Sequence, residues 1–290
     1  MSSSDGRLNP LTAGYSQPVD SPLYTNGERG WAYRDSFFAG VQYETNRDAF
    51  LDLLPLGLKP LHDIPQVFIW AIDCRTAGLG DFYEMKIEML VEYEGSPHTY
   101  CPYIMVSQRD DEGLPPDAAM AVGREMIGAP KKIGRIRWKR DSGQVQATLE
   151  RPAGSPIVTV SVAPKEQLSP EELGIADAIP NLYLRVIPNV EGGIPSVAEL
   201  VRFEIPNRYD PTQTFRGSGM VHFGAPSAED PWHRLAPERV LHGITAAFAL
   251  DIPPRGEVVI DYRQRGASLE ERGQVADPAL AAPPGSAGDR

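Results

Sequence analysis

The stretch Met85-Lys-Ile-Glu-Met-Leu-Val-Glu-Tyr93 decides the fold class. Apolar side chains stand at every second position of it, and Lys86, Glu88 and Glu92 occupy positions between them. A period of two is typical of a β-strand with one buried face. The same alternation recurs between Gly, Pro, Asn and Asp residues in residues 145–149, 158–162, 183–187, 201–205, 220–223 and 258–262. Many short strands at close spacing predict a mostly β protein, either a barrel or a sandwich.

Helical signals are few. Asn46 can cap a short helix that ends before Pro55, because proline does not continue a helix. Asp117 can cap a second helix over residues 118–127, which ends at Gly128. We therefore expect a few short helices beside the strands.

The ends of the chain differ in composition from its middle. Residues 1–20 are polar and contain Pro and Gly, and residues 266–290 run through Ala-Pro-Pro-Gly-Ser-Ala-Gly. Such segments offer little apolar surface to bury, so both are expected to be disordered. Residues 21–265 are expected to form one domain.

Charge and hydropathy exclude two classes of partner. The formal net charge is -11, whereas a protein that binds nucleic acid clusters Lys and Arg against the phosphates. No apolar run approaches the roughly 20 residues of a membrane-spanning helix. The first residues lack a basic start followed by an apolar segment, so no secretory signal is expected. We expect neither a nucleic-acid nor a membrane partner, and a cytoplasmic location.

Several other motifs point to no chemistry. Cys74 and Cys101 lack C-x-x-C spacing and are expected to be free thiols. The five histidines show no metal-binding spacing, so neither a metal nor another cofactor is expected. Arg216-Gly-Ser-Gly219 lacks the spacing of a phosphate-binding loop and is expected to be a turn.

The adjacent lysines Lys131 and Lys132 carry the strongest chemical signal. They lie in Ala121-Val-Gly-Arg-Glu-Met-Ile-Gly-Ala-Pro-Lys-Lys-Ile-Gly134, after a helix end in an otherwise apolar stretch. A lysine attacks a ketone only as the neutral amine, and an ordinary pKa of about 10.4 leaves under about one part in a thousand neutral at pH 7. Burial and a neighbouring cation, here Lys132 or Arg34, both disfavour the ammonium. Without further context, such a pair is expected to be exposed.

The wider context of this pair resembles a known family. Gly123-Arg-Glu125 and Pro130-Lys-Lys-Ile-Gly134 resemble the signature of the acetoacetate decarboxylase-like superfamily. Further matches follow the order expected for it: Thr76-Ala-Gly-Leu-Gly-Asp-Phe-Tyr-Glu84, Leu184-Arg-Val-Ile-Pro-Asn189 and Pro254-Arg-Gly-Glu-Val-Val-Ile-Asp-Tyr262. The resemblance covers residues 21–263 and implies a mostly β (α+β) fold, namely a closed antiparallel β-barrel with a few short helices, and a homo-oligomer.

The resemblance also implies roles for individual residues. Lys131 would form a Schiff base with the substrate, and Lys132 would perturb it, as is known for a lysine activated by a cationic neighbour. Glu84 falls on an active-site glutamate of the family and would move protons or position Arg34. Arg34 falls on an active-site arginine that would bind a substrate carboxylate; Arg29 is the alternative position for this arginine.

One position departs from the family pattern. Ile69 stands where the decarboxylases of the family carry a second glutamate, so it is expected to line the substrate site. Loss of that acid would remove a possible proton donor and change the charge of the pocket. The departure puts acetoacetate decarboxylation in doubt, while Schiff-base formation at Lys131 is unaffected.

The expected function is that of a lyase acting on a small keto acid through a Schiff base. The simplest reaction is decarboxylation of a β-keto acid. The alternative is aldolase-dehydratase or retro-aldol chemistry on a pyruvate-like keto acid, which uses the same iminium and enamine. A second alternative is a non-catalytic barrel that binds a small ligand.

Overall fold

The computed structural model describes Leu8 and residues 16–24, 30–109, 115–169, 172 and 179–264. The segment 266–290, expected to be disordered, and most of residues 1–20 lie outside the described residues. Ser16 is nevertheless buried, and its hydroxyl donates a hydrogen bond to Glu125 Oε2 at 2.8 Å. Packed contacts therefore begin before the predicted domain boundary at residue 21.

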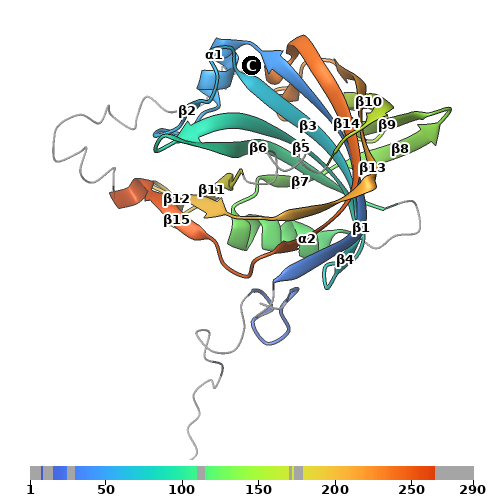
Figure 1. Ribbon diagram of the computed structural model, residues 1–290. Helices are drawn as coiled ribbons and strands as arrows, with labels where there is room; N and C mark the ends of the chain where they lie inside the picture. Colours follow the sequence, from blue (N-terminus) through green and yellow to red (C-terminus); the bar gives the residue numbers. More distant parts are fainter. Residues whose placement is uncertain are drawn as a thin grey trace, which may run out of the picture.

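The described strands form one 15-stranded sheet that wraps strongly around itself (Figure 1). The strands are β1 (Trp31–Thr45), β2 (Lys59–Pro60), β3 (Gln66–Cys74), β4 (Thr76–Ala77), β5 (Phe82–Tyr93), β6 (Ser96–Gln108), β7 (Lys131–Ile133), β8 (Arg135–Asp141), β9 (Gln144–Glu150), β10 (Pro156–Gln167), β11 (Asn181–Ile187), β12 (Val197–Phe203), β13 (Asn207–Phe223), β14 (Pro237–Ile252) and β15 (Glu257–Asp261). Hydrogen-bonded neighbours follow the order β15-β12-β11-β6-β5-β3-β1-β14-β13-β10-β9-β8, while β2 pairs with β5, β4 with β1 and β7 with β6.

The helices are short, as predicted. They are α1 (Arg47–Asp52), α2 (Asp117–Val122), the π-helix η1 (Gly123–Ile127) and the 3-10 helix η2 (Trp232–Leu235). The Asn46 side chain caps α1 as predicted, because it accepts hydrogen bonds from two backbone N–H groups of the first turn. α2 begins at Asp117 itself, so Asp117 is not the cap. Its continuation η1 ends, as predicted, at Gly128, whose φ of 82° favours glycine.

The predicted closed antiparallel barrel is wrong in two respects, although the mostly β class is confirmed. Among the described residues, no hydrogen-bonded pairing joins β15 to β8, the two ends of the sheet. In addition, β6 pairs in parallel with both β7 and β11. The first half of β6 pairs with β11 at Thr99 and Tyr100, and its second half pairs with β7 from Ile104 to Val106. The sheet therefore divides at β6 and remains open.

The two faces of the central strands have different surroundings. Odd-numbered residues of β3 and β5, such as Ile69 and Met85, pack in the main hydrophobic core. Even-numbered residues of the same strands, such as Trp70 and Glu84, line a cavity on the opposite face. This follows from the alternation of side chains along a strand. α2 packs against β7, the strand that begins at Lys131 (Figure 1).

The turn predicted at Arg216-Gly-Ser-Gly219 is wrong, because these residues lie within β13 and pair with β10 and β14. A side chain at Gly217 would overlap the carbonyl group of Ala163, and one at Gly219 would lie 2.8 Å from Val41. The glycines therefore allow neighbouring backbones to approach closely.

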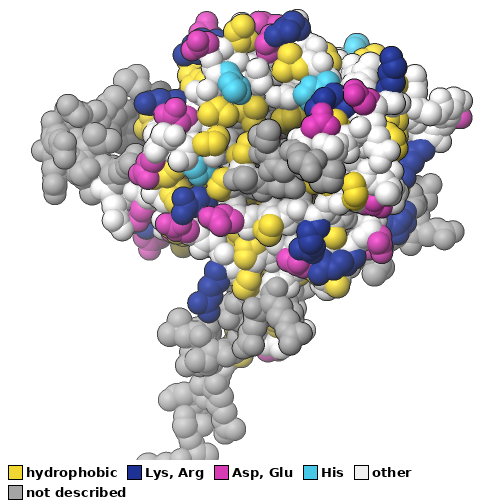
Figure 2. Space-filling model, in the orientation of Figure 1, with side chains coloured by type: hydrophobic (Ala, Val, Ile, Leu, Met, Phe, Trp, Pro, Cys, Tyr) yellow, Lys and Arg dark blue, Asp and Glu magenta, His cyan; other side chains and the backbone are white. Residues whose placement is uncertain are grey.

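On the face drawn in Figure 2, Lys and Arg side chains are interspersed with Asp and Glu. Within the described part of the chain, none of the helices has the length and apolar character needed to cross a membrane.

Candidate active site

Lys131 is held in place by the Gly123-Arg-Glu segment. Its side chain is buried, with 6% of the residue exposed. Gly123 lies directly against the lysine stem: a Cβ at this position would be 2.6 Å from Lys131 Cδ. Arg124 donates a hydrogen bond to the Lys131 carbonyl oxygen at 2.9 Å, and Glu125 accepts hydrogen bonds from Ser16 and Tyr24. Gly123 and Arg124 thus contact Lys131, and Glu125 joins the segment to Ser16 and Tyr24.

Glu84 meets Lys131 inside the protein. Its Oε2 lies 3.0 Å from Lys131 Nζ, and both side chains are largely buried. The two residues come from strands on either side of β6, where Glu84 is opposite Val106 and Lys131 is opposite Ile104. The ring of Phe82 lies below the lysine, with 5.3 Å from Nζ to the ring centroid. The structure therefore brings together an amine, a carboxylate and an aromatic ring.

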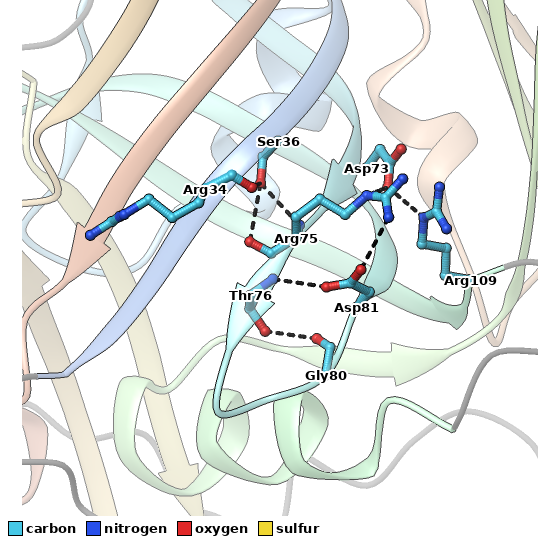
Figure 3. A network of polar contacts seen from close by, with 8 residues as sticks. All are labelled: Arg34, Ser36, Asp73, Arg75, Thr76, Gly80, Asp81 and Arg109. Atoms are coloured by element: carbon cyan, nitrogen blue, oxygen red, sulfur yellow. Dashed lines mark hydrogen bonds and ion pairs between the residues drawn. The ribbon is translucent and has the colours of Figure 1, made fainter.

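The hairpin before Glu84 is fixed by a polar network (Figure 3). Asp81 accepts a hydrogen bond from the Thr76 backbone N–H at 3.1 Å and forms an ion pair with Arg75 at 3.1 Å. The Thr76 hydroxyl donates to the Gly80 carbonyl oxygen at 2.7 Å. These contacts close the turn of the Thr76-to-Glu84 motif, so β5 starts in the register that points Glu84 at Lys131.

Lys131 and Glu84 open into a cavity of about 190 Å³. This volume suits a small molecule, since pockets for drug-sized ligands measure about 300–1,000 Å³. Most of the lining is apolar, and much of it is aromatic. The aromatic and polar side chains of the lining are Tyr33, Phe38, Phe68, Trp70, Glu84, Lys86, Glu88, Thr99, Lys131, Asn181, Tyr183, Asn207, Tyr209 and Phe248.

A second ion pair, between the partly buried Lys86 and the buried Glu88, lies in the same cavity. Lys86 Nζ is 2.6 Å from Glu88 Oε1, and Trp70 Nε1 donates a hydrogen bond to Glu88 Oε2 at 2.7 Å. Burial acts to lower the pKa of Lys86, but the Glu88 and Glu84 carboxylates raise it, and the pKa lies well above its usual value. Lys86 is therefore an ammonium at neutral pH. No sequence motif pointed to a role for this pair or for Trp70.

Other buried thiols and phenols, three of them in the cavity lining, stay neutral. Burial raises the pKa of the Cys74 thiol well above its usual value, and it does the same for Cys101 and for the phenols of Tyr33 and Tyr183. Both cysteines are free. At neutral pH they are protonated thiols, which are poor nucleophiles.

Arg34 does not reach the cavity. Its guanidinium donates to the Leu250 carbonyl oxygen and pairs with Asp251 at 2.7 Å, and its side chain is 51% exposed. Asp35, with φ of 51°, forms a bulge in β1, so that Tyr33 faces the cavity and Arg34 faces outward. In Figure 3 the Arg34 side chain points away from the Arg75 network. The alternative, Arg29, lies outside the described residues.

Lys132 is also directed away from the cavity. It follows Lys131 on β7, and successive side chains of a strand point to opposite faces. Its Nζ donates to Asp230 Oδ1 at 2.8 Å and to the Glu229 carbonyl oxygen at 2.5 Å. The Lys132 ammonium, which was expected to perturb Lys131, is therefore paired with Asp230 outside the cavity. Lys86 is the cation that lines the cavity together with Lys131.

Ile69 does not line the cavity. It is fully buried in the main core, opposite Ile87 of β5, while its neighbours Phe68 and Trp70 face the cavity. Ile69 therefore lies outside the lining of the cavity that contains Lys131 and Glu84, contrary to the expected position. The residue at position 69 does not set the charge of the cavity, and the carboxylates there are Glu84 and Glu88.

Comparisons with known proteins identify similar sequences. A family model described as acetoacetate decarboxylase (ADC) matches residues 20–262. The acetoacetate decarboxylase of Streptomyces nogalater is 29% identical over 200 residues, which cover 69% of this chain and 77% of that protein.

Two solved structures show the same fold. An acetoacetate decarboxylase superposes with a TM-score of 0.76 at 24% identity, covering 87% of this chain and 97% of the other. The enduracididine biosynthesis enzyme MppR, solved with pyruvate, superposes with a TM-score of 0.71 at 23% identity, covering 86% and 98%.

Proposed function

Because the chain belongs to the acetoacetate decarboxylase family, we propose that it is a lyase that binds a small keto acid covalently through a Schiff base on Lys131. Its simplest reaction is decarboxylation of a β-keto acid. The observation that carries the proposal is the buried pair of Lys131 Nζ and Glu84 Oε2, 3.0 Å apart at the wall of a mostly apolar cavity.

The first half of the reaction requires one proton acceptor, which Glu84 supplies. Glu84 takes a proton from the Lys131 ammonium, and the neutral amine adds to the ketone carbon to form a carbinolamine. Return of that proton to the hydroxyl group releases water and leaves an iminium. The negative Glu84 then lies beside the positive iminium, and in an apolar cavity this attraction is stronger than in water.

The second half uses the iminium as an electron sink. The electron pair of the bond to the carboxylate carbon moves into the iminium, so carbon dioxide leaves and an enamine remains. A proton added at carbon restores the iminium, and water releases the ketone and regenerates Lys131. The aromatic lining supports the bond cleavage, because a carboxylate loses its charge when it leaves as carbon dioxide.

Aldolase-dehydratase chemistry on a pyruvate-like acid is the second candidate. The buried Lys86 ammonium favours it, since a fixed cation stabilises a carboxylate that is retained through the reaction. A relative in fold, MppR, was solved with pyruvate. Both candidates share the iminium on Lys131 and differ in whether a C–C bond to a carboxylate is broken.

Borohydride trapping tests the shared intermediate. The protein is incubated with acetoacetate or with pyruvate, reduced, weighed as an intact protein and mapped by peptide digestion. We expect one reduced adduct, on Lys131, and the same adduct in the control Lys132→Met, whose altered side chain lies on the opposite face. Release of carbon dioxide from acetoacetate would identify decarboxylation. An adduct-free protein would support the non-catalytic alternative, and an adduct on a different lysine would contradict the role of Lys131.

A further inference from the structure

The cavity holds a charged group that the proposed reaction does not use. Lys86 follows Glu84 by two positions on β5, so both side chains face the cavity, and their Cα atoms are about 7 Å apart. The Lys86 side chain is 17% exposed. A cation this deeply placed is costly unless it has anionic partners.

The hydrogen bonds of Lys86 are incompletely used. An ammonium has three N–H donors. Among the described residues, Lys86 Nζ donates a hydrogen bond to Glu88 Oε1 alone, at 2.6 Å. Trp70 binds the other oxygen of Glu88 and so holds this carboxylate in place. Lys86 therefore retains donors for a ligand in the cavity, and the ligand group that suits an ammonium is an anion such as a carboxylate.

A wall of aromatic side chains lines the cavity beside these charges, since Trp70 pairs with Lys86 and Phe68 with Glu88 between β3 and β5. The ring of Phe38 lies at its centre, with centroid distances of 4.8 Å to Trp70, 5.6 Å to Phe248 and 5.9 Å to Tyr209. Phe68 stacks on Trp70 at 4.7 Å. These rings come from β1, β3, β13 and β14, and all of them line the cavity. A cluster of tilted and edge-on rings offers a further ring the contact geometries that aromatic groups prefer.

We propose that the cavity recognises a keto acid with an aromatic substituent, that Lys86 binds its carboxylate, and that the wall around Phe38 and Trp70 holds its ring. The inference rests on the proposed function, because Lys131 and Glu84 fix the position of the ketone carbon. Lys86 is next to Glu84 along β5 and so takes the acid end of the substrate. The remaining substituent of the ketone then occupies the rest of the cavity, which the aromatic wall lines. Lys86 is thus a specificity-determining residue, in the role that the sequence predicted for Arg34.

The test compares ligands that differ by one group. Pyruvate with phenylpyruvate, and acetoacetate with 4-phenylacetoacetate, differ by a phenyl ring. Phenylacetone keeps the ring and the ketone but lacks the carboxylate. The concentration that gives half-maximal borohydride adduct on Lys131 is measured for each. We expect each phenyl compound to be trapped at a concentration at least about tenfold lower than its partner, as expected for one buried ring.

Variants separate the two recognition elements. Lys86→Met is combined with Glu88→Gln, because removing one partner would leave the other charge buried, and glutamine still accepts the hydrogen bond from Trp70. The double variant should raise the half-maximal concentration of phenylpyruvate about 10-fold to 100-fold, the value of a charge-assisted hydrogen bond, without changing that of phenylacetone. Phe38→Leu should weaken trapping of the phenyl compounds, whereas Phe37→Leu, on the opposite face of β1, should not.

Three results would count against the inference. If pyruvate and acetoacetate are trapped as well as or better than phenylpyruvate and 4-phenylacetoacetate, the cavity does not recognise an aromatic substituent. An equal loss for phenylacetone and phenylpyruvate in the double variant would show that Lys86 is merely structural. Both results leave the Schiff base on Lys131 intact, whereas a failure of all five compounds to form an adduct in the wild-type protein would overturn the proposed function itself.

Discussion

Gly123→Ala should slow adduct formation at Lys131 strongly while changing the free energy of unfolding only a little. A Cβ at this position would lie 2.6 Å from Lys131 Cδ and 2.8 Å from Cε, about 1 Å inside the separation of about 3.5–4.0 Å that carbon atoms prefer. The backbone at Gly123 has φ of -58° and ψ of -50°, which alanine adopts readily. The added methyl group therefore acts on the position of Lys131 rather than on the helix.

The two effects on stability oppose one another. Replacing glycine by alanine within a helix stabilises it by about 1 kcal/mol, and overpacking costs about 1–3 kcal/mol. The free energy of unfolding should thus change by no more than about 2 kcal/mol. A displacement of about 1 Å at the reacting amine can lower the rate about 100-fold.

The assay is the rate of borohydride-trapped adduct formation at a saturating keto acid concentration, with urea unfolding measured in parallel. Ala121→Gly is the control: it should lower helix stability by about 1 kcal/mol while leaving the trapping rate unchanged. If Gly123→Ala forms the adduct at the wild-type rate, contact between Gly123 and the lysine stem does not position Lys131, and the glycine of the Gly123-Arg-Glu segment has no part in the chemistry.

Three further variants test individual contacts. Arg34→Met should leave trapping unchanged and cost no more than about 1 kcal/mol, because the pair with Asp251 is exposed; a large loss of trapping would return Arg34 to the site. Ile69→Glu should yield no folded protein in circular dichroism, since a buried charge costs several kcal/mol against a total stability of about 5–15 kcal/mol, whereas Ile69→Val should cost about 0.5–1.5 kcal/mol. Burial and the hydrogen bond to Glu125 raise the pKa of Tyr24 to about 12. The protonated Tyr24 hydroxyl therefore contributes fully to the free energy of unfolding below the unfolded pKa of about 10, and this contribution is lost as the pH rises towards about 12. The difference in free energy of unfolding between wild type and Tyr24→Phe, measured by urea titration, should shrink over this range. A constant difference would refute the raised pKa.

Lys131 and Glu84 could be singled out from the sequence because short motifs surround them, and local structure fixes where each side chain points. The helix before Lys131 ends at a glycine, and the turn before Glu84 is closed by Asp81 and Thr76. Both features are read directly from short motifs. The period of two along β5 also placed Lys86 and Glu84 on one face, but it did not show whether that face meets solvent or a cavity.

The predicted positions of Ile69 and Arg34 were wrong because their strands have no distinct polar face or lose the regular alternation of side chains. β3 is apolar on both sides, so its sequence does not show that Trp70 rather than Ile69 faces the cavity. The bulge at Asp35 reverses the facing of β1 residues, and a single positive φ at an aspartate has no reliable signal in one sequence. Pairing of β6 with β7 and β11 depends on contacts distant along the chain, and so does the open sheet that results.

The two sides of the cavity are encoded in separate parts of the chain. Glu84 and Lys131 lie on β5 and β7 with only β6 between them in the sheet, whereas much of the aromatic wall comes from β1, β13 and β14, at opposite ends of the chain. Short-range contacts form with less loss of chain entropy than long-range ones, so the lysine and its carboxylate can be assembled before the aromatic wall. If the proposed function holds, substitutions in β14 would change which acid is accepted while Lys131 and Glu84 remain the same.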